Sequence, residues 1–397
     1  EKTMQTKLDA IKLDHDSYIA LHVQLHNVLR QLIISRRWQH GERIPGETQL
    51  AKHLNISRTT VRIAFQSAEV EGLITRIAGR GTFVSYEASS HNNTRFVGYV
   101  TRSFHNEIHR ILLSSAETEL RSEGYSIIFS NARTNSDEVD VIKQLLNNHV
   151  NGLILWANAN VTDGQRSILR EYRSRNIPIV FIDRLVDGIP ADYVGSDNYG
   201  GTYALVSHLV ELGHRHVVYL THSIANLYPV DERYRGYRAA MGAYNLPSHD
   251  LWKVNSPHTN EFFETDLFQL LDEQNIDITE QIIHLMKTAS PRPTAIACVN
   301  DALAIMTMRA IRQMGLNVPE DVSVVGFDDI SVAAHMDVPL TTASQDAHEI
   351  GQRAARVLLE RLDGMASPPA HLTVPTRLQI RMSTTTPIEI NEPLSNE

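Results

Sequence analysis

Cysteine is nearly absent from this sequence, because Cys298 is the single one among 397 residues. A lone thiol cannot close a disulfide within the chain or build a cysteine-based zinc cluster, which favours a reducing compartment. In the letters AIACVN the residue stands in an apolar run, where free cysteine is usually buried. We therefore expect Cys298 to be a buried strand residue.

Long apolar runs and export signals are also lacking. No stretch of about 18 uncharged apolar residues occurs, and no basic segment followed by a hydrophobic block opens the chain. The composition, with 42% hydrophobic and 21% charged residues, is ordinary for a globular protein of two or three domains. We expect a cytoplasmic protein that does not enter a membrane.

The short motifs of common active sites are missing as well. The sequence contains no phosphate-binding P-loop, no Gly-x-Gly-x-x-Gly fingerprint after the first strand of the long C-terminal region, and no Gly-x-Ser-x-Gly elbow. His105 and His109 are spaced as two ligands on a helix would be, but no glutamate completes an H-E-x-x-H frame. We expect no enzyme activity, no cofactor and no metal.

Charge is distributed unevenly along the chain, whose net charge is −9. Residues 1–86 carry 12 Lys and Arg against 8 Asp and Glu, a net charge of +4, which leaves 25 against 38, a net charge of −13, for the remainder. A basic front end can approach a phosphate backbone while the acidic remainder stays in solution. The split suggests a nucleic-acid partner for the front end.

The front end has the pattern of a small helical domain. Apolar residues at helical spacing predict an amphipathic helix over residues 18–37, preceded by a mobile arm over residues 1–17. A second helix opens after Gly46 as its N-cap, and a third begins at Ser57, whose hydroxyl can cap it. The letters GLITRIAGRGTFVS then predict a hairpin. Residues 18–85 thus indicate a winged helix-turn-helix.

The third helix has two different faces. Its apolar face consists of Val61, Ala64, Phe65 and Ala68, and its polar face of Arg58, Thr59, Arg62 and Gln66. Arg58 and Arg62 are one turn apart, so both guanidinium groups can enter a major groove and bind guanine. Arg80, between two glycines, can reach a phosphate or a minor groove. The alternative is that these charges form only a solvated face.

A family resemblance supports the DNA-binding interpretation. The segment ERIPGETQLAKHLNISRTTVRIAFQSAEVEGLITRIAGRGTFV resembles the DNA-binding domain of the GntR family, because it joins a helix-turn-helix to a Gly-Arg-Gly-Thr-Phe wing. The partner expected for this domain is double-stranded operator DNA. The residues expected to contact it are Thr48, Ser57, Arg58, Thr59, Thr60, Arg62, Gly79, Arg80 and Gly81.

A different pattern begins after a polar segment. Residues 86–94, YEASSHNNT, have no periodicity and are expected to be a linker. From residue 95, about nine apolar runs alternate with helical stretches, which predicts an α/β fold with parallel sheets. The pattern divides near residues 198–215, so residues 95–385 should form two lobes around a cleft lined by strand carboxyl ends. Residues 386–397 would be a tail.

This second region resembles the effector domain of the LacI/GalR family, which is similar in fold to periplasmic sugar-binding proteins. The motifs that carry the resemblance are VNGLIL, IPIVFIDR, YVGSDNYGGTYALVSHLVELGHRHVVYL, RYRGYRAAM, PTAIACVNDALAIMTMRAIRQMGLNVPEDVSVVGFDDI and PLTTASQDAHEIGQRAARVLLERL, in this order. The resemblance implies a small sugar effector in the cleft.

Residues carried over from the family lie at the expected strand ends and helix starts. The set expected to bind the effector is His109, Trp156, Asp183, Arg184, Arg233, Phe262, Asn300, Asp328 and Gln345. Carboxylates, amides and a guanidinium can jointly satisfy the vicinal hydroxyls of a neutral monosaccharide. Trp156 and Phe262 or Phe263 can stack on its ring, although core packing is the alternative for each aromatic residue.

Other roles remain open for three of the charged residues. Asp183 and Asp328 can instead cap helices, and Arg233 can simply balance Asp183. Asp301 is expected to be structural, for instance as a helix cap.

A GntR-like head on a LacI-like body resembles the arabinose repressors. The resemblance implies a homodimer that blocks carbohydrate-use genes until a sugar binds, with arabinose the first candidate, by changing the spacing of the paired heads. Two rivals stay open: an activator or co-repressed regulator built from the same parts, and a sugar-processing enzyme with a DNA-binding module, for which no acid and base pair is evident. A plain sugar receptor is disfavoured by the basic front end.

Overall fold

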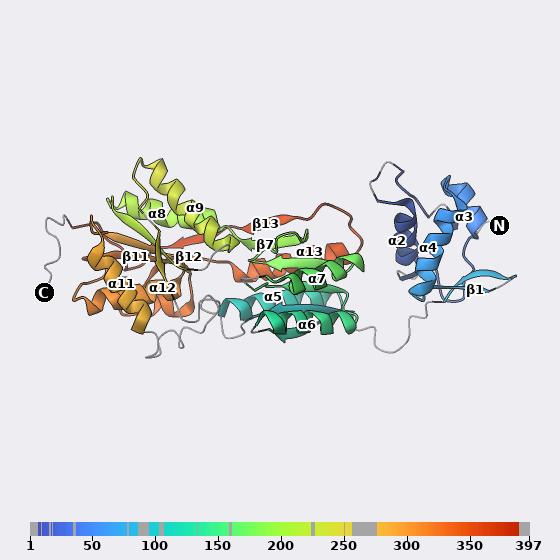
Figure 1. Ribbon diagram of the computed structural model, residues 1–397, viewed down its shortest axis with the longest axis horizontal. Coiled ribbons are helices and arrows are strands. Elements are labelled where there is room, and N and C mark those ends of the chain that lie inside the picture. Colours follow the sequence, from blue (N-terminus) through green and yellow to red (C-terminus); the bar gives the residue numbers. More distant parts are fainter. Residues whose placement is uncertain are drawn as a thin grey trace. The chain divides into compact units, whose positions relative to one another are not determined.

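The computed structural model in Figure 1 divides the chain into two compact units, residues 1–93, here called the head, and residues 94–397, here called the body. It describes residues 7–388 except 9, 16, 18, 35–36, 78, 86–94, 103–106, 133, 159–160, 224–226, 250 and 256–275. The expected linker over residues 86–94 and the expected effector residue Phe262 lie outside the described residues. No described helix is long and apolar enough to cross a membrane.

The head is a small helical domain closed by a hairpin. Its elements are α2 (Leu21–Ile34), α3 (Glu47–Leu54), α4 (Arg58–Val70), β1 (Ile74–Ile77) and β2 (Gly81–Val84). Both predicted caps are present, since Gly46 is the N-cap of α3 and Ser57 Oγ accepts a hydrogen bond from Thr60 N at 3.0 Å. The two strands pair antiparallel. The predicted winged helix-turn-helix is confirmed, with a first helix shorter than expected.

The segment before α2 packs against the head. Leu8 is 9% exposed and Ile11 is 2% exposed, and both belong to the head's hydrophobic core. His15 Nε2 lies 3.1 Å from Leu54 O at the end of α3. The predicted mobile arm over residues 1–17 is therefore wrong for its described residues, because two isolated apolar side chains gain a place in the core without forming a periodic pattern.

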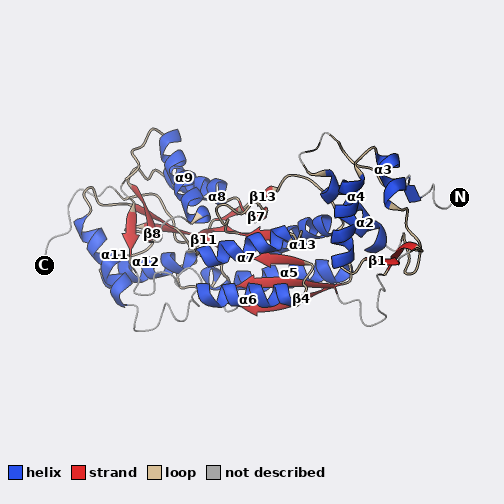
Figure 2. Cartoon of the chain, turned by 45° about the vertical axis from the view of Figure 1, so that its right-hand side comes forward, coloured by secondary structure: helices blue, strands red, loops and turns tan. Residues whose placement is uncertain are grey.

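The body contains two lobes, each built on a six-stranded sheet. The first lobe comprises β3 (Arg95–Thr101), α5 (Glu107–Ser122), β4 (Tyr125–Asn131), α6 (Asn135–Asn147), β5 (Gly152–Leu155), α7 (Asp163–Ser174), β6 (Ile179–Ile182), β7 (Asp192–Ser196), α13 (Ala347–Leu362) and β13 (His371–Val374). Its strand order is β13-β7-β6-β5-β3-β4, and its paired strands are parallel. Figure 2 shows its helices beside the red strands.

The second lobe has the same plan. It comprises α8 (Asn198–Glu211), β8 (Val217–His222), α9 (Tyr228–Ala243), β9 (Trp252–Val254), α11 (Ile276–Thr288), β10 (Ala295–Cys298), α12 (Asp301–Gln313), β11 (Ser323–Asp328), the 3-10 helix η2 (Ser331–Ala334), β12 (Thr341–Ser344) and β14 (Arg377–Gln379). Its strand order is β14-β12-β11-β10-β8-β9, parallel except for the antiparallel pair of β12 and β14. The α/β fold is confirmed.

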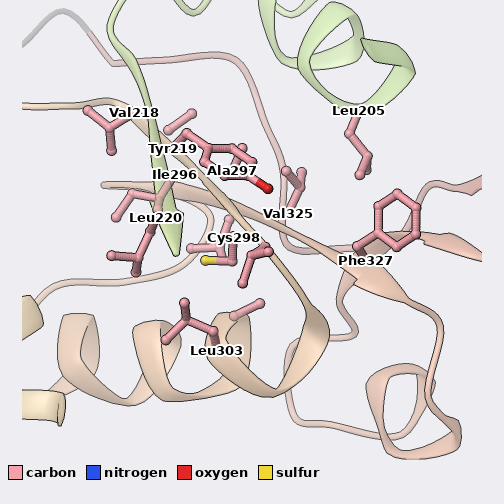
Figure 3. Close-up of a cluster of buried hydrophobic side chains, with 14 of the residues drawn as sticks. Leu205, Val218, Tyr219, Leu220, Ile296, Ala297, Cys298, Leu303, Val325 and Phe327 are labelled. Atoms are coloured by element: carbon pink, nitrogen blue, oxygen red, sulfur yellow. The ribbon is translucent and has the colours of Figure 1, made fainter. Parts of the chain in front are cut away.

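Both faces of these sheets are covered, which explains the continuous apolar runs in the sequence. In the first lobe, Val97 and Tyr99 pack with α5 and α13 on one face, whereas Val100 packs with α6 and α7 on the other. In the second lobe, the core joins β8, β10 and β11 to α8 and α12 (Figure 3). Cys298 is buried there with its Sγ 3.4 Å from Thr307 Oγ1, as its strand position predicted.

The chain crosses between the lobes three times, after β7, after β12 and between β13 and β14. The predicted division near residues 198–215 finds only the first crossing. It misses the return of α13 and β13 to the first lobe, because β12, β13 and β14 are three- or four-residue strands rich in Thr, Ser, Arg and Gln, without an apolar run.

Candidate nucleic-acid interface and effector pocket

The polar face of α4 is exposed as predicted. Arg58, Thr59, Arg62 and Gln66 are exposed, whereas Val61, Ala64, Phe65 and Ala68 are buried. Arg58 and Arg62 form no ion pair with any described residue, so both guanidinium groups stay available to a partner. Exposed arginines near a helix start, held by a packed opposite face, suit the major groove of a duplex.

The hairpin and α3 add further exposed groups to the head. Thr48 on α3 and Arg80 at the hairpin tip are exposed. Gly79 has a φ of +73° and Gly81 a φ of +118°, which L side chains rarely adopt. A Cβ at Gly81 would also lie 2.8 Å from Arg43 Nε. The two glycines therefore permit the turn that presents Arg80.

Two of the predicted contact residues have a structural task. The hydroxyls of Ser57 and Thr60 lie 2.8 Å apart, and Ser57 caps α4. Their side chains are therefore committed to the helix start, and any contact with DNA at this point falls to the exposed Thr59 and the backbone.

Sequence analysis missed Arg76, which ties the parts of the head together. Its Nη1 lies 3.4 Å from Glu47 Oε1 on α3, and its Nε lies 3.3 Å from Glu69 Oε2 on α4. The guanidinium also lies 5.7 Å from the Phe65 ring centroid. Arg76 is thus a charge-paired residue that fixes β1 against both helices. Its role depends on contacts with α3 and α4, which the sequence pattern of a strand does not show.

The body brings eight of the nine predicted effector residues together around one pocket. They are His109, Trp156, Asp183 and Arg184 from the first lobe, Arg233, Asn300 and Asp328 from the second, and Gln345 between β12 and α13. Apolar residues that sequence analysis did not name complete the lining, namely Ile108, Leu227, Pro229 and Val230. The pocket thus lies at the carboxyl ends of strands, between the lobes.

Asp183 and Asp328 end their strands in a strained backbone conformation. Their φ angles are +63° and +119°, in a region that non-glycine residues rarely occupy. Neither caps a helix, since the next described helices along the chain, α8 and η2, have Asp197 and Ile330 as their N-caps. Burial raises the pKa of Asp183, and it raises the pKa of Asp328 to about 6 against the opposing effect of Arg233.

Arg233 is held on every side. Its Nη2 lies 3.3 Å from Asp328 Oδ1, its Nε donates to Asn198 Oδ1 at 2.7 Å, and its Nη1 donates to Val299 O at 2.6 Å. Its guanidinium lies 3.7 Å from the Phe327 ring centroid. The partner of Arg233 is therefore Asp328 and not Asp183. The other pocket aspartate, Asp183, forms its ion pair with Arg184, whose Nε lies 3.8 Å from Asp183 Oδ2.

Trp156 has one face covered by protein. The His109 ring lies 4.0 Å from the Trp156 ring, centroid to centroid, and His109 Nδ1 lies 2.9 Å from Thr101 Oγ1. Any stacking of a sugar ring on Trp156 must use its other face. Trp156 Nε1 is buried without a hydrogen-bond partner among the described residues, so it also offers the pocket a donor.

Asp301 is structural, although it is not the helix cap. Its Oδ1 accepts from Thr342 Oγ1 at 2.5 Å and its Oδ2 accepts from Ile330 N at 3.0 Å. Burial, together with the neighbouring charge of Asp328, raises the pKa of Asp301. The carboxyl group therefore links α12 to β12 and to Ile330 in the turn after β11, close to the strand end at which Asp328 reaches the pocket.

The polar lining of the pocket is suited to hydrogen bonding with a ligand. Its polar groups are hydrogen-bonding carboxylates, amides and guanidinium groups, and the described residues contain no cluster of three metal-ligating side chains. The free volume is about 40 Å³, far below a typical small-molecule site, which holds roughly 300–1,000 Å³. The surrounding side chains or lobes must therefore move apart to admit a ligand.

Comparison with known proteins agrees with both halves of this description. Residues 21–84 match the bacterial regulatory proteins of the gntR family, and residues 206–384 match the periplasmic binding protein-like domain. An arabinose metabolism transcriptional repressor from Geobacillus stearothermophilus is 31% identical over 354 residues, which cover 86% of this chain and 91% of that protein.

Solved structures match the body. A putative ribose operon repressor from Burkholderia thailandensis is 27% identical with a TM-score of 0.60, over 72% of this chain and 99% of that one. A dimeric Lac repressor is 25% identical with a TM-score of 0.59, over 74% of this chain and 100% of that one. With a gntR-type head, a periplasmic-binding-protein-like body and 31% identity over most of its length, the chain belongs to the family of the arabinose metabolism transcriptional repressors.

Proposed function

We propose that this chain is a transcription repressor that binds operator DNA through α4 and the hairpin of its head, and releases it when a neutral sugar binds between the lobes of its body. The observation that carries the proposal is that one chain contains both an exposed arginine face on its head and a pocket of balanced charge in its body. The names of the relatives support the same function for this chain.

The charges of the pocket favour a neutral ligand. Two aspartates face two arginines, and all three kinds of nitrogen on Arg233 already have protein partners. A carboxylate or phosphate group on the ligand would find no uncommitted guanidinium at Arg233 and would meet Asp183 and Asp328. Hydroxyl groups, which donate and accept, fit both carboxylates. We therefore place neutral sugars ahead of uronic acids and sugar phosphates. Among neutral sugars, the name of the relative from Geobacillus stearothermophilus places arabinose first.

Repression requires the pocket to act on paired heads. Helix-turn-helix proteins commonly bind two half-sites as a dimer, and a solved relative of the body is a dimeric repressor, so we propose a homodimer. Residues 86–94 would be the linker that carries the signal and residues 386–397 a tail outside the effector domain. Because its target is operator DNA, the regulator would act in the cytoplasm.

A thermal-shift panel tests the pocket directly. A ligand at about 100 times its Kd adds roughly 2.7 kcal/mol of stability, which moves the unfolding temperature measurably. The panel contains neutral pentoses and hexoses, the matching uronic acids and the matching phosphates. Stabilisation by a neutral sugar alone is expected, and stabilisation by the acids or phosphates contradicts the charge argument.

The sign of the sugar's effect on operator affinity separates a repressor released by its inducer from a co-repressed regulator. An operator is first selected from random duplexes with the full chain, and its Kd is measured with and without the stabilising sugar. A repressor released by its inducer binds more weakly with sugar present, whereas a co-repressed regulator binds more tightly.

A further inference from the structure

Five polar residues form a closed ring of hydrogen bonds and one ion pair beside the pocket, through their side chains and the backbone carbonyl of Ser196. Ser196 Oγ donates to Gln345 Oε1, and Gln345 Nε2 donates to Asp328 Oδ1 at 2.6 Å. Arg233 Nη2 lies 3.3 Å from the same oxygen, while Arg233 Nε donates to Asn198 Oδ1 at 2.7 Å. Asn198 Nδ2 closes the ring by donating to Ser196 O at 3.1 Å.

The ring joins the pocket to two of the three lobe crossings. Ser196 and Asn198 flank the first crossing, between β7 and α8, and Gln345 stands in the second, between β12 and α13. Asp328 and Arg233 line the pocket. The crossings are the segments about which the two lobes can rotate, because they are the chain's only continuous links between the sheets. The first two crossings are thus linked by the hydrogen bond between the side chains of Ser196 and Gln345.

Most of the ring is removed from water. Ser196 and Asn198 are each 2% exposed and Arg233 is 6% exposed. Leaving a buried polar group unpaired costs free energy, and hydrogen bonds within a network strengthen one another. The complete ring is therefore stable, and a conformation in which one of its bonds is broken has a higher free energy. Rotation of one crossing against the other separates Ser196 from Gln345 and opens it.

We propose that this ring is the hinge lock of the body, in which Ser196, Asn198 and Gln345 are positioning residues that couple the pocket carboxylate of Asp328 to the angle between the lobes. The inference rests on the proposed sugar response. Both amide atoms of Gln345 are used within the ring, so its role differs from the direct effector contact predicted from the sequence. A sugar hydroxyl that bonds Asp328 enters the same network and changes which lobe angle is most stable.

Ser196→Ala tests the lock by removing one hydroxyl. Spin labels are placed on exposed positions of the two lobes, through Asp140→Cys on α6 and Lys287→Cys on α11, and their separation is measured by pulsed electron resonance without sugar. Cys298 does not compete for the label, because it is buried and burial raises the pKa of its thiol to about 12. The full chain is expected to give one narrow distance distribution, and Ser196→Ala a broader or displaced one.

Ser323→Ala is the matched control. It also removes one buried serine hydroxyl, which lies 3.1 Å from His214 Nε2 in the second lobe, away from the crossings. It is expected to lower the unfolding temperature without changing the distance distribution. Gln345→Glu provides a second way to open the ring, because it keeps the acceptor for Ser196 and sets a like charge against Asp328. A distribution unchanged in both Ser196→Ala and Gln345→Glu overturns the lock.

Operator release is measured on the same variants with L-arabinose. For Ser196→Ala we expect the sugar affinity to stay within about threefold of that of the unsubstituted chain. The factor by which sugar weakens operator binding should fall by about tenfold. An unchanged ratio also counts against the lock. If L-arabinose fails to release DNA from the unsubstituted chain, the proposed function fails for that sugar, whereas the distance distributions still decide whether the ring holds the hinge.

Discussion

The head and the body use arginine in opposite ways. On the head, Arg58 and Arg62 are exposed and have no ion-pair partner among the described residues. In the body, Arg233 is buried and bonded through all three kinds of nitrogen. An exposed cation can exchange counterions for phosphates and base edges, whereas a buried one fixes the geometry of its neighbours. We therefore propose that the same residue type binds DNA in one unit, whereas it fixes the geometry of a pocket in the other.

The largest difference should appear when each arginine is removed. Arg233→Ala leaves Asp328 without its cation inside the body, and breaking such a pair costs about 3–5 kcal/mol in the free energy of unfolding. Urea unfolding at pH 7.5 measures the loss. Arg233→Ala with Asp328→Asn should recover part of it, because the unpaired charge is gone. An unchanged unfolding midpoint for the single variant contradicts the comparison.

On the head, Arg58→Ala or Arg62→Ala should leave stability nearly unchanged and weaken operator binding. The expected cost is about 1–3 kcal/mol if the side chain contacts a base, with a shallower dependence of affinity on salt. Fluorescence anisotropy at several salt concentrations measures both. Arg121→Ala, an exposed arginine on α5 of the body, is the control for charge removal. Equal losses from all three variants argue against a specific face.

The pocket should also respond to pH. Burial raises the pKa of Asp328 to about 6, so the carboxyl is ionised at pH 8 and largely protonated at pH 5. A sugar hydroxyl that donates to the carboxylate favours the ionised form, so sugar affinity rises as the pH passes through about 6 and levels off once the carboxyl is fully ionised. Calorimetry should show about tenfold weaker binding at pH 5 than at pH 8, and Asp328→Asn should remove this slope.

The smallest expected effect concerns the cap of α4. Ser57→Ala removes the hydroxyl that accepts the hydrogen bond from Thr60 N, which costs about 1 kcal/mol of local stability. Hydrogen exchange of the α4 amides in the full chain should become faster, while exchange in the body strands stays the same. Weaker operator binding by Ser57→Ala, without faster hydrogen exchange of the α4 amides, would instead assign the Ser57 hydroxyl to DNA contact.

Local chemistry explains how far the sequence could predict the structure. The helix starts at Gly46 and Ser57, the two faces of α4 and the first nine body strands all follow from side-chain pattern and were found. The packing of Leu8 and Ile11 and the short strands β12, β13 and β14 depend on partners distant in the chain, which periodicity does not report.

The residues that line the pocket were predicted better than the contacts that hold those residues in place. Family positions gave eight residues that meet in one place, but the pairing of Arg233 with Asp328 and the part played by Asn198 are properties of three-dimensional contact. Asn198 stands in the letters YVGSDN directly after a strand, a signal for a crossing residue that sequence analysis quoted and did not use. Which partner a buried polar group selects depends on geometry that spacing alone does not contain.

One titration tests most directly whether the buried site governs the exposed one. The full chain is bound to its selected operator, and L-arabinose, or the neutral sugar that the thermal-shift panel identifies, is added while anisotropy is followed. The account predicts that saturating sugar weakens operator affinity by about 5- to 150-fold, and that Asp183→Ala, which removes a pocket carboxylate, binds DNA normally but does not respond. Sugar that binds the body and leaves operator affinity unchanged would contradict it.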